Sequence, residues 1–86
     1  MATQTLHVTI LSPTQTIFEG QALAISSKNS AGKFDILPQH ANFITLIENQ
    51  PIVLLLPGKK SLNFNFPKAI IYTTQNLIKI YSDITL

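Results

Sequence analysis

The sequence has no cysteine and no arginine, and it has only three glycines among its 86 residues. Without cysteine, the chain forms neither disulfides nor zinc–thiolate sites, and it has no cysteine nucleophile. Proteins that read nucleic acids usually contact phosphates and guanine through arginine, so its absence counts against that function. The glycines Gly20, Gly32 and Gly58 lie too far apart for a dinucleotide-binding fingerprint or a P-loop.

Charged side chains are scarce. They make up 12% of the residues, about half of the usual share of roughly 25%. Six lysines against four acids give a net charge of +2 and a pI near 9.2. Only Lys59 and Lys60 are adjacent, so the excess does not indicate a basic patch. A surface this poor in charge must use uncharged polar side chains, or a partner must cover part of it.

Long apolar runs are missing as well. The longest extends from Ile52 to Leu56 between two prolines, whereas a membrane-spanning helix needs about 20 apolar residues. The N-terminus has neither the basic region nor the apolar stretch of a signal peptide. We therefore expect one soluble domain over residues 1–86, which reaches a membrane only through other proteins.

Alternation of apolar and polar residues is the dominant pattern, as in Leu6–Ile10 and Leu62–Phe66. We expect Glu19–Gly20 to supply a left-handed turn position and Thr74–Asn76 to close a C-terminal hairpin. The predicted fold is all-β: a small β-sandwich or flattened barrel of about nine or ten short, mostly antiparallel strands. The candidate strands lie near residues 5–11, 16–18, 21–28, 33–37, 43–47, 51–56, 61–66, 69–73 and 77–81.

Residues suited to catalysis are few. His7 lies on the polar face of a strand, where we expect a surface residue. His40 lies in a proline-containing turn, and its nearest acid is Asp35. This pair is too small for a zinc site and has no accompanying nucleophile. A small hydrolase that uses His40 and Asp35 stays open only as a third hypothesis.

Phe64 and Phe66 alternate with Asn63 and Asn65, a pattern that a stacking platform for single-stranded nucleic acid would also show. Both rings share a face with Leu62, which favours a place in the core. The alternative function is a free-standing β-barrel module that binds a protein or single-stranded nucleic acid.

Two segments carry a family resemblance, namely Leu11–Ala22 (LSPTQTIFEGQA) and Gly32–Ala41 (GKFDILPQHA). With the strand Phe43–Ile47 that follows, they resemble the N-terminal domain of the epsilon subunit of F-type ATP synthase. The resemblance extends from about Leu6 to Asp83 and is strongest up to residue 47.

The chain departs from that family at four places. Asp35 stands where the family has a glycine, and Asn42 stands where it has a proline. Glu48–Pro51 replaces a Lys-Pro-Gly turn, and Pro67–Ala69 replaces a Gly-Gly pair. The last change replaces flexible residues by a rigid one, and we expect it to leave the strands on either side intact. The family's C-terminal helical hairpin would begin where this sequence ends.

The resemblance implies a non-catalytic rotor subunit without a cofactor, peripheral to the cytoplasmic face of the inner (plasma) membrane. In this family the domain lies in the central stalk and links the gamma subunit to the c-ring, so that proton-driven rotation is coupled to ATP synthesis. It implies no contact with nucleic acid, and contact with the membrane only through the complex. Carried over by position, the residues on the c-ring side are Lys33, Leu37, Pro38, Gln39 and His40, and those on the gamma side are Ile17, Phe18 and Ala41.

Overall fold

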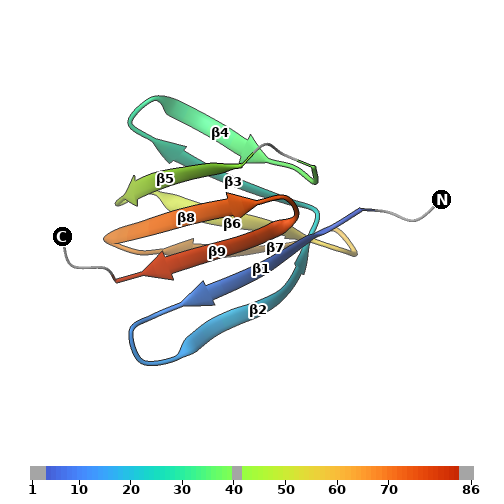
Figure 1. Ribbon diagram of the computed structural model, residues 1–86, viewed down its shortest axis with the longest axis horizontal. Helices are drawn as coiled ribbons and strands as arrows, with labels where there is room; N and C mark the ends of the chain where they lie inside the picture. The colour runs from blue at the N-terminus through green and yellow to red at the C-terminus, as the bar shows by residue number, and fades with distance from the viewer. Residues whose placement is uncertain (1–3, 40–41, 84–86) are drawn as a thin grey trace.

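The computed structural model describes residues 4–39 and 42–83, and within these ranges it contains nine β-strands and no helix (Figure 1). The all-β prediction is therefore confirmed. The strands are β1 (Leu6–Leu11), β2 (Thr16–Ala22), β3 (Ala24–Asn29), β4 (Gly32–Ile36), β5 (Phe43–Glu48), β6 (Pro51–Leu56), β7 (Lys60–Asn65), β8 (Lys68–Thr74) and β9 (Leu77–Ser82).

The strands form two sheets that pack face to face as a sandwich. One sheet has the order β2-β1-β9-β8-β5 and the other has the order β4-β3-β6-β7. Strands β1 and β9 run parallel, and the other paired strands of the described chain run antiparallel. Strands β4 and β5 lie on one side of the molecule, and β2 lies on the opposite side (Figure 1).

The second strand is longer than predicted. It continues through Gly20 to Ala22, and the chain passes to the other sheet at Leu23, whose N–H donates to the Leu55 carbonyl at 2.6 Å. The expectation of a left-handed turn at Gly20 is wrong, because Gly20 pairs with Val8 in the β1–β2 ladder. A Cβ on Gly20 would lie 3.1 Å from the tip of the Phe18 ring. The glycine therefore makes room for an aromatic side chain.

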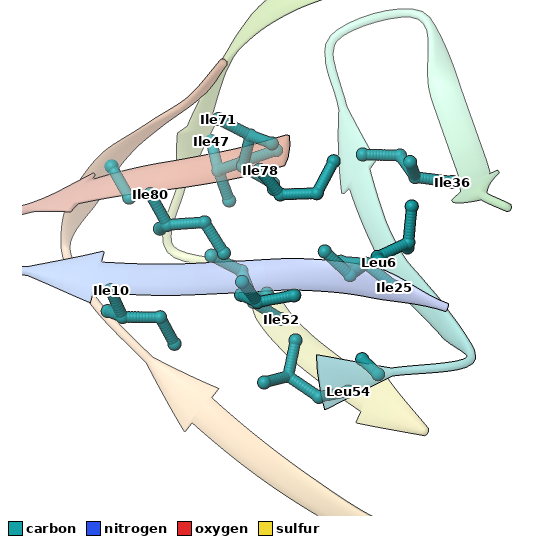
Figure 2. Packing of buried hydrophobic residues seen from close by; sticks show 13 residues of the cluster. Leu6, Ile10, Ile25, Ile36, Ile47, Ile52, Leu54, Ile71, Ile78 and Ile80 are labelled. Atoms are coloured by element: carbon teal, nitrogen blue, oxygen red, sulfur yellow. The ribbon is translucent and has the colours of Figure 1, made fainter. Parts of the chain in front are cut away.

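The core lies between the sheets and consists of aliphatic side chains. Figure 2 shows isoleucines and leucines of both sheets that point toward one another. Burying each such side chain contributes roughly 1.5–3 kcal/mol, so alternation along each strand determines which face turns inward. The fully buried apolar residues are Leu6, Val8, Ile10, Ala22, Ile25, Ile36, Ile47, Ile52, Leu54, Ala69, Ile71, Ile78 and Ile80.

Half-buried phenylalanines pack at both sides of this core. Phe34 of β4 meets Phe43 of β5 edge to face, with ring centroids 5.5 Å apart. Phe18 of β2 meets Phe64 of β7 at 6.1 Å. Each aromatic pair joins one sheet to the other, so ring contacts link the two sheets at both edges of the sandwich.

The segment Pro67–Ala69 leaves the neighbouring strands intact, as expected. Strand β8 begins at Lys68, directly after the proline. The Pro67 carbonyl accepts a hydrogen bond from the Asn49 N–H at 3.0 Å, and Ala69 is fully buried. A rigid residue is tolerated here because the turn between β7 and β8 needs the carbonyl of residue 67 and not its N–H.

Candidate functional site

The loop after β4 carries three of the residues expected on the c-ring side. The Leu37 side chain is 54% exposed, Pro38 is half-buried, and Gln39 is exposed with a left-handed backbone at φ 65°. The Gln39 N–H donates to Asn76 Oδ1 at 2.6 Å. Because Asn76 belongs to the turn between β8 and β9, the exposed loop is fixed to the end of the five-stranded sheet.

A second hydrogen bond supports the same loop from its far end. Asn42 Oδ1 accepts from the Gln75 N–H at 3.1 Å. Asn42, which stands where the family has a proline, thus supplies a hydrogen-bond acceptor that a proline side chain could not supply. The Asn76 carbonyl also accepts from the His7 N–H at 2.8 Å. The two loops and the start of β1 therefore form one connected unit. His40 and Ala41 lie outside the described residues.

Lys33 lies at the other end of β4. It is exposed and stands directly opposite Lys28 in the β3–β4 ladder. Leu37 lies four positions further along the chain, which is roughly 13 Å in an extended strand at about 3.3 Å per residue. The structure therefore places Lys33 on the same edge of the sandwich as Leu37, but does not bring the two side chains together.

Ile17 and Phe18, expected on the gamma side, lie on the opposite edge of the sandwich. Both are half-buried and pack against the core. The Phe18 ring lies over Gly20 and contacts Phe64. These two side chains therefore pack against the core and are only partly exposed to solvent, whereas Leu37 and Gln39 project from the surface.

The phenylalanines weighed as a stacking platform belong to the core. Phe64 and Phe66 stack at 6.1 Å with their planes 13° apart, and both are half-buried against the buried cluster. The preference for the core over a nucleic-acid platform is confirmed. Asn63 and Asn65 point to solvent, on the face opposite the two rings.

No cluster of side chains suited to metal binding is found in the described part of the chain. Residues 4–39 and 42–83 contain no group of three histidine, aspartate or glutamate side chains close enough to bind a metal ion. Asp35 accepts a hydrogen bond from Ser26 Oγ at 2.6 Å. His7 lies on the surface, as predicted, and its Nε2 lies 3.1 Å from Glu19 Oε2. The described residues also include no helix of the length and apolarity that crossing a bilayer requires.

The sequence reasoning missed the outer face of the five-stranded sheet. Ile44 of β5, Tyr72 of β8, and Leu77 and Tyr81 of β9 are all exposed there. A signal was present in the sequence: Ile70, Ile71 and Tyr72 are consecutive and apolar. Consecutive apolar residues place apolar side chains on both faces of a strand.

Two sheets packed around an aliphatic core define the chain as a β-sandwich domain. A family model for the β-sandwich domain of the delta/epsilon chain of ATP synthase matches residues 5–85. The chain belongs to this family, and the resemblance to the epsilon subunit is confirmed.

Individual relatives agree with this assignment. The ATP synthase epsilon chain of Stenotrophomonas maltophilia is 27% identical over 79 residues, which cover 92% of this chain and 56% of the relative. The chain thus spans about half of the length of that relative.

Solved structures show the same fold. A chain in the mitochondrial ATP synthase of Euglena gracilis, solved as OSCP/F1/c-ring, matches 95% of this chain and 52% of its own length, with a TM-score of 0.85 and 12% identity. A chain in the central stalk and c-ring of the Tetrahymena thermophila mitochondrial enzyme matches 95% of this chain and 66% of its own length, with a TM-score of 0.76 and 14% identity.

Proposed function

We propose that this chain is a non-catalytic rotor subunit of a proton-translocating ATP synthase, in which it links the gamma subunit to the c-ring. In this role it transmits rotation of the ring to the shaft, so that ion flow is coupled to ATP synthesis. Membership of the delta/epsilon family supports the proposal, as does a structural relative in a central stalk with its c-ring. The chain is held at the cytoplasmic face of the inner (plasma) membrane through the complex.

One observation carries the proposal: among the described residues, the candidate contacts for the two partners lie on opposite edges of one sandwich (Figure 1). Lys33 and Leu37–Gln39 lie on the edge formed by β4 and β5. Ile17 and Phe18 lie on the β2 edge, which Phe18 joins to β7. Aromatic pairs tie the sheets together at both edges. A domain built in this way suits a rigid spacer between two proteins.

The residues divide between the two partners as follows. We place Lys33 and the loop at opposite ends of the c-ring contact, because β4 separates them by roughly 13 Å. The hydrogen bond from Gln39 to Asn76 holds the loop in place before binding, which lowers the entropy that association would otherwise cost. The c-ring set is Lys33, Leu37, Pro38, Gln39 and His40, and the gamma set is Ile17, Phe18 and Ala41.

The test is size-exclusion chromatography with multi-angle light scattering of this chain mixed with the gamma subunit from the same genome. We expect co-elution with the mass of a one-to-one complex at tens of micromolar. Separate elution at that concentration would contradict the proposal.

The same instrument tests the nucleic-acid alternative. The chain and a single-stranded oligonucleotide are expected to elute separately even at low salt, where phosphate contacts are strongest. Co-elution that disappears at high salt would favour the nucleic-acid module over the rotor subunit.

A further inference from the structure

The loop after β4 and the turn between β8 and β9 are fastened to each other by two hydrogen bonds that run in opposite directions. Both connections lie at the same end of the sandwich (Figure 1). The Gln39 N–H of the loop donates to Asn76 Oδ1 of the turn at 2.6 Å. The Gln75 N–H of the turn donates to Asn42 Oδ1 at 3.1 Å. Each connection thus supplies one donor and one acceptor. We call the two acceptors, Asn42 and Asn76, the asparagine clasp.

The two donors of these bonds share an unusual backbone conformation. Gln39 has φ 65° and Gln75 has φ 53°, which is the left-handed region that residues other than glycine seldom occupy. Holding such a residue there costs free energy, which the surrounding structure must supply. In both cases the N–H of the left-handed residue is the group that the clasp binds. The loop and the turn therefore support each other's conformation.

Both asparagines are anchored in the five-stranded sheet. The Asn76 carbonyl accepts from the His7 N–H at 2.8 Å, next to the start of β1. Asn42 directly precedes β5, whose first residue, Phe43, stands opposite Thr73 of β8. Paired strands open less readily than loops do. The clasp therefore fastens a loop that leaves one sheet to the paired strands of the other sheet.

The segment that the clasp holds is short, exposed and fixed at both ends. Ile36, the last residue of β4, is fully buried, whereas Leu37 beside it is 54% exposed. Pro38 follows with its restricted backbone, and Gln39 is then bonded to Asn76. An exposed leucine on a segment of this kind offers a partner a preformed contact. Preformed contacts bind more tightly because less conformational entropy is lost on association.

We propose that Asn42 and Asn76 are positioning residues for the c-ring contact: through the two hydrogen bonds they hold Leu37, Pro38 and Gln39 in the conformation that meets the ring. This inference rests on the proposed function and adds residues that do not themselves touch the partner. The clasp acts as a unit. Each bond fixes the connection that carries the acceptor of the other bond, so breaking either one loosens both.

Alanine substitutions remove the side-chain acceptors and leave the backbone unchanged. The measurement is the affinity of the complex of this chain with gamma for the c-ring of the same organism, held in lipid nanodiscs and followed by biolayer interferometry. Asn42→Ala and Asn76→Ala are each expected to weaken c-ring binding about three- to tenfold, the loss that one such hydrogen bond represents. Asn65→Ala, at an exposed position of β7, is the matched control and is expected to stay within about twofold.

Two further readouts separate positioning from a general loss of structure. Affinity for gamma is expected to stay within about twofold in both alanine variants, because Ile17 and Phe18 lie on the opposite edge of the sandwich. Asn42→Asp and Asn76→Asp keep an acceptor oxygen at the same place, so they are expected to bind the c-ring within about threefold of the wild type. This comparison is made at about 0.3 M salt, where the added charge is screened.

The double variant tests whether the clasp acts as a unit. Residues that share one hydrogen-bonded arrangement show effects that do not simply add in free energy. The chain with both Asn42→Ala and Asn76→Ala is therefore expected to bind the c-ring about as well as the weaker of the two single variants. Losses that multiply instead would mean two independent supports, and would overturn the claim of a single clasp.

The outcomes also separate this inference from the function beneath it. If the wild-type complex does not bind the c-ring at all, the proposed function itself fails. If it binds and both alanine variants bind equally well, the contact does not need the clasp and only the inference is overturned. If the alanine variants lose gamma and c-ring affinity together, or the aspartate variants fail to restore binding, Asn42 and Asn76 are not positioning residues for the ring. Selective loss with alanine and recovery with aspartate is the expected result.

Discussion

Two threonines on adjacent strands differ in what their hydroxyl groups contact. Thr73 of β8 is 1% exposed, and its Oγ1 has no hydrogen-bond partner within residues 4–39 and 42–83. Thr45 of β5 is half-buried, and its Oγ1 accepts a hydrogen bond from Asn29 Nδ2 at 2.9 Å. Valine has nearly the same shape as threonine but no hydroxyl. The same substitution is therefore expected to change stability in opposite directions at the two sites.

The magnitudes follow from the cost of leaving a buried polar group unpaired, which is about 1–3 kcal/mol. Thr73→Val removes such a group and is expected to raise the free energy of unfolding by about 1 kcal/mol or more. Thr45→Val leaves the Asn29 amide without its acceptor and is expected to lower that free energy by about 1–2 kcal/mol. In a domain of this size each 1 kcal/mol moves the melting temperature by about 4–8 °C. The two variants should therefore melt at least about 8 °C apart.

Urea denaturation followed by circular dichroism measures both changes, and an unchanged m-value confirms that the comparison is between similar unfolding transitions. Thr74→Val, on the outer face of β8, is the control and is expected to stay within about 0.5 kcal/mol of the wild type. A Thr73→Val variant less stable than the wild type by 1 kcal/mol would refute the reasoning, because it would mean that the Thr73 hydroxyl is hydrogen-bonded.

Two further predictions concern backbone geometry near the proposed contacts. Asn76→Ala removes the acceptor of the Gln39 N–H. Hydrogen exchange at the Gln39 amide, followed by NMR, should therefore accelerate about tenfold, which corresponds to a hydrogen bond worth about 1.4 kcal/mol. An unchanged exchange rate would show that other contacts hold the loop. Gly32→Ala places a side chain on a backbone with φ 123°, where no neighbouring atom obstructs it. Urea denaturation should therefore show that the free energy of unfolding falls by about 1–3 kcal/mol. An unaltered urea midpoint would contradict the assigned backbone conformation.

Much of the fold was predictable because period-two alternation is a local property of the chain. Leu6, Val8 and Ile10 alternate with polar residues and are all fully buried. Gly20 misled the prediction, because a glycine between polar residues is typical of a turn. Its actual role depends on the Phe18 ring above it. The passage between sheets at Leu23 has no local signal, since it depends on a hydrogen bond to the distant Leu55.

The candidate contacts were less predictable because they depend on how strands lie beside one another. Lys33 and Leu37 are close in the sequence, yet an extended strand keeps them apart. Ile44 and Tyr72 are distant in the sequence, yet they are direct cross-strand neighbours. Their shared outer face follows from the order of the strands in the sheet, which alternation alone does not reveal.

The rotor proposal is tested most directly by measuring whether proton movement is coupled to ATP hydrolysis. The measurement is ATP-driven proton uptake by membrane vesicles that contain the organism's ATP synthase without this subunit, followed by quenching of a pH-sensitive dye. Adding the wild-type chain is expected to restore uptake. Uptake that is already complete without the chain, or that its addition leaves unchanged, would contradict a role in linking the gamma subunit to the c-ring.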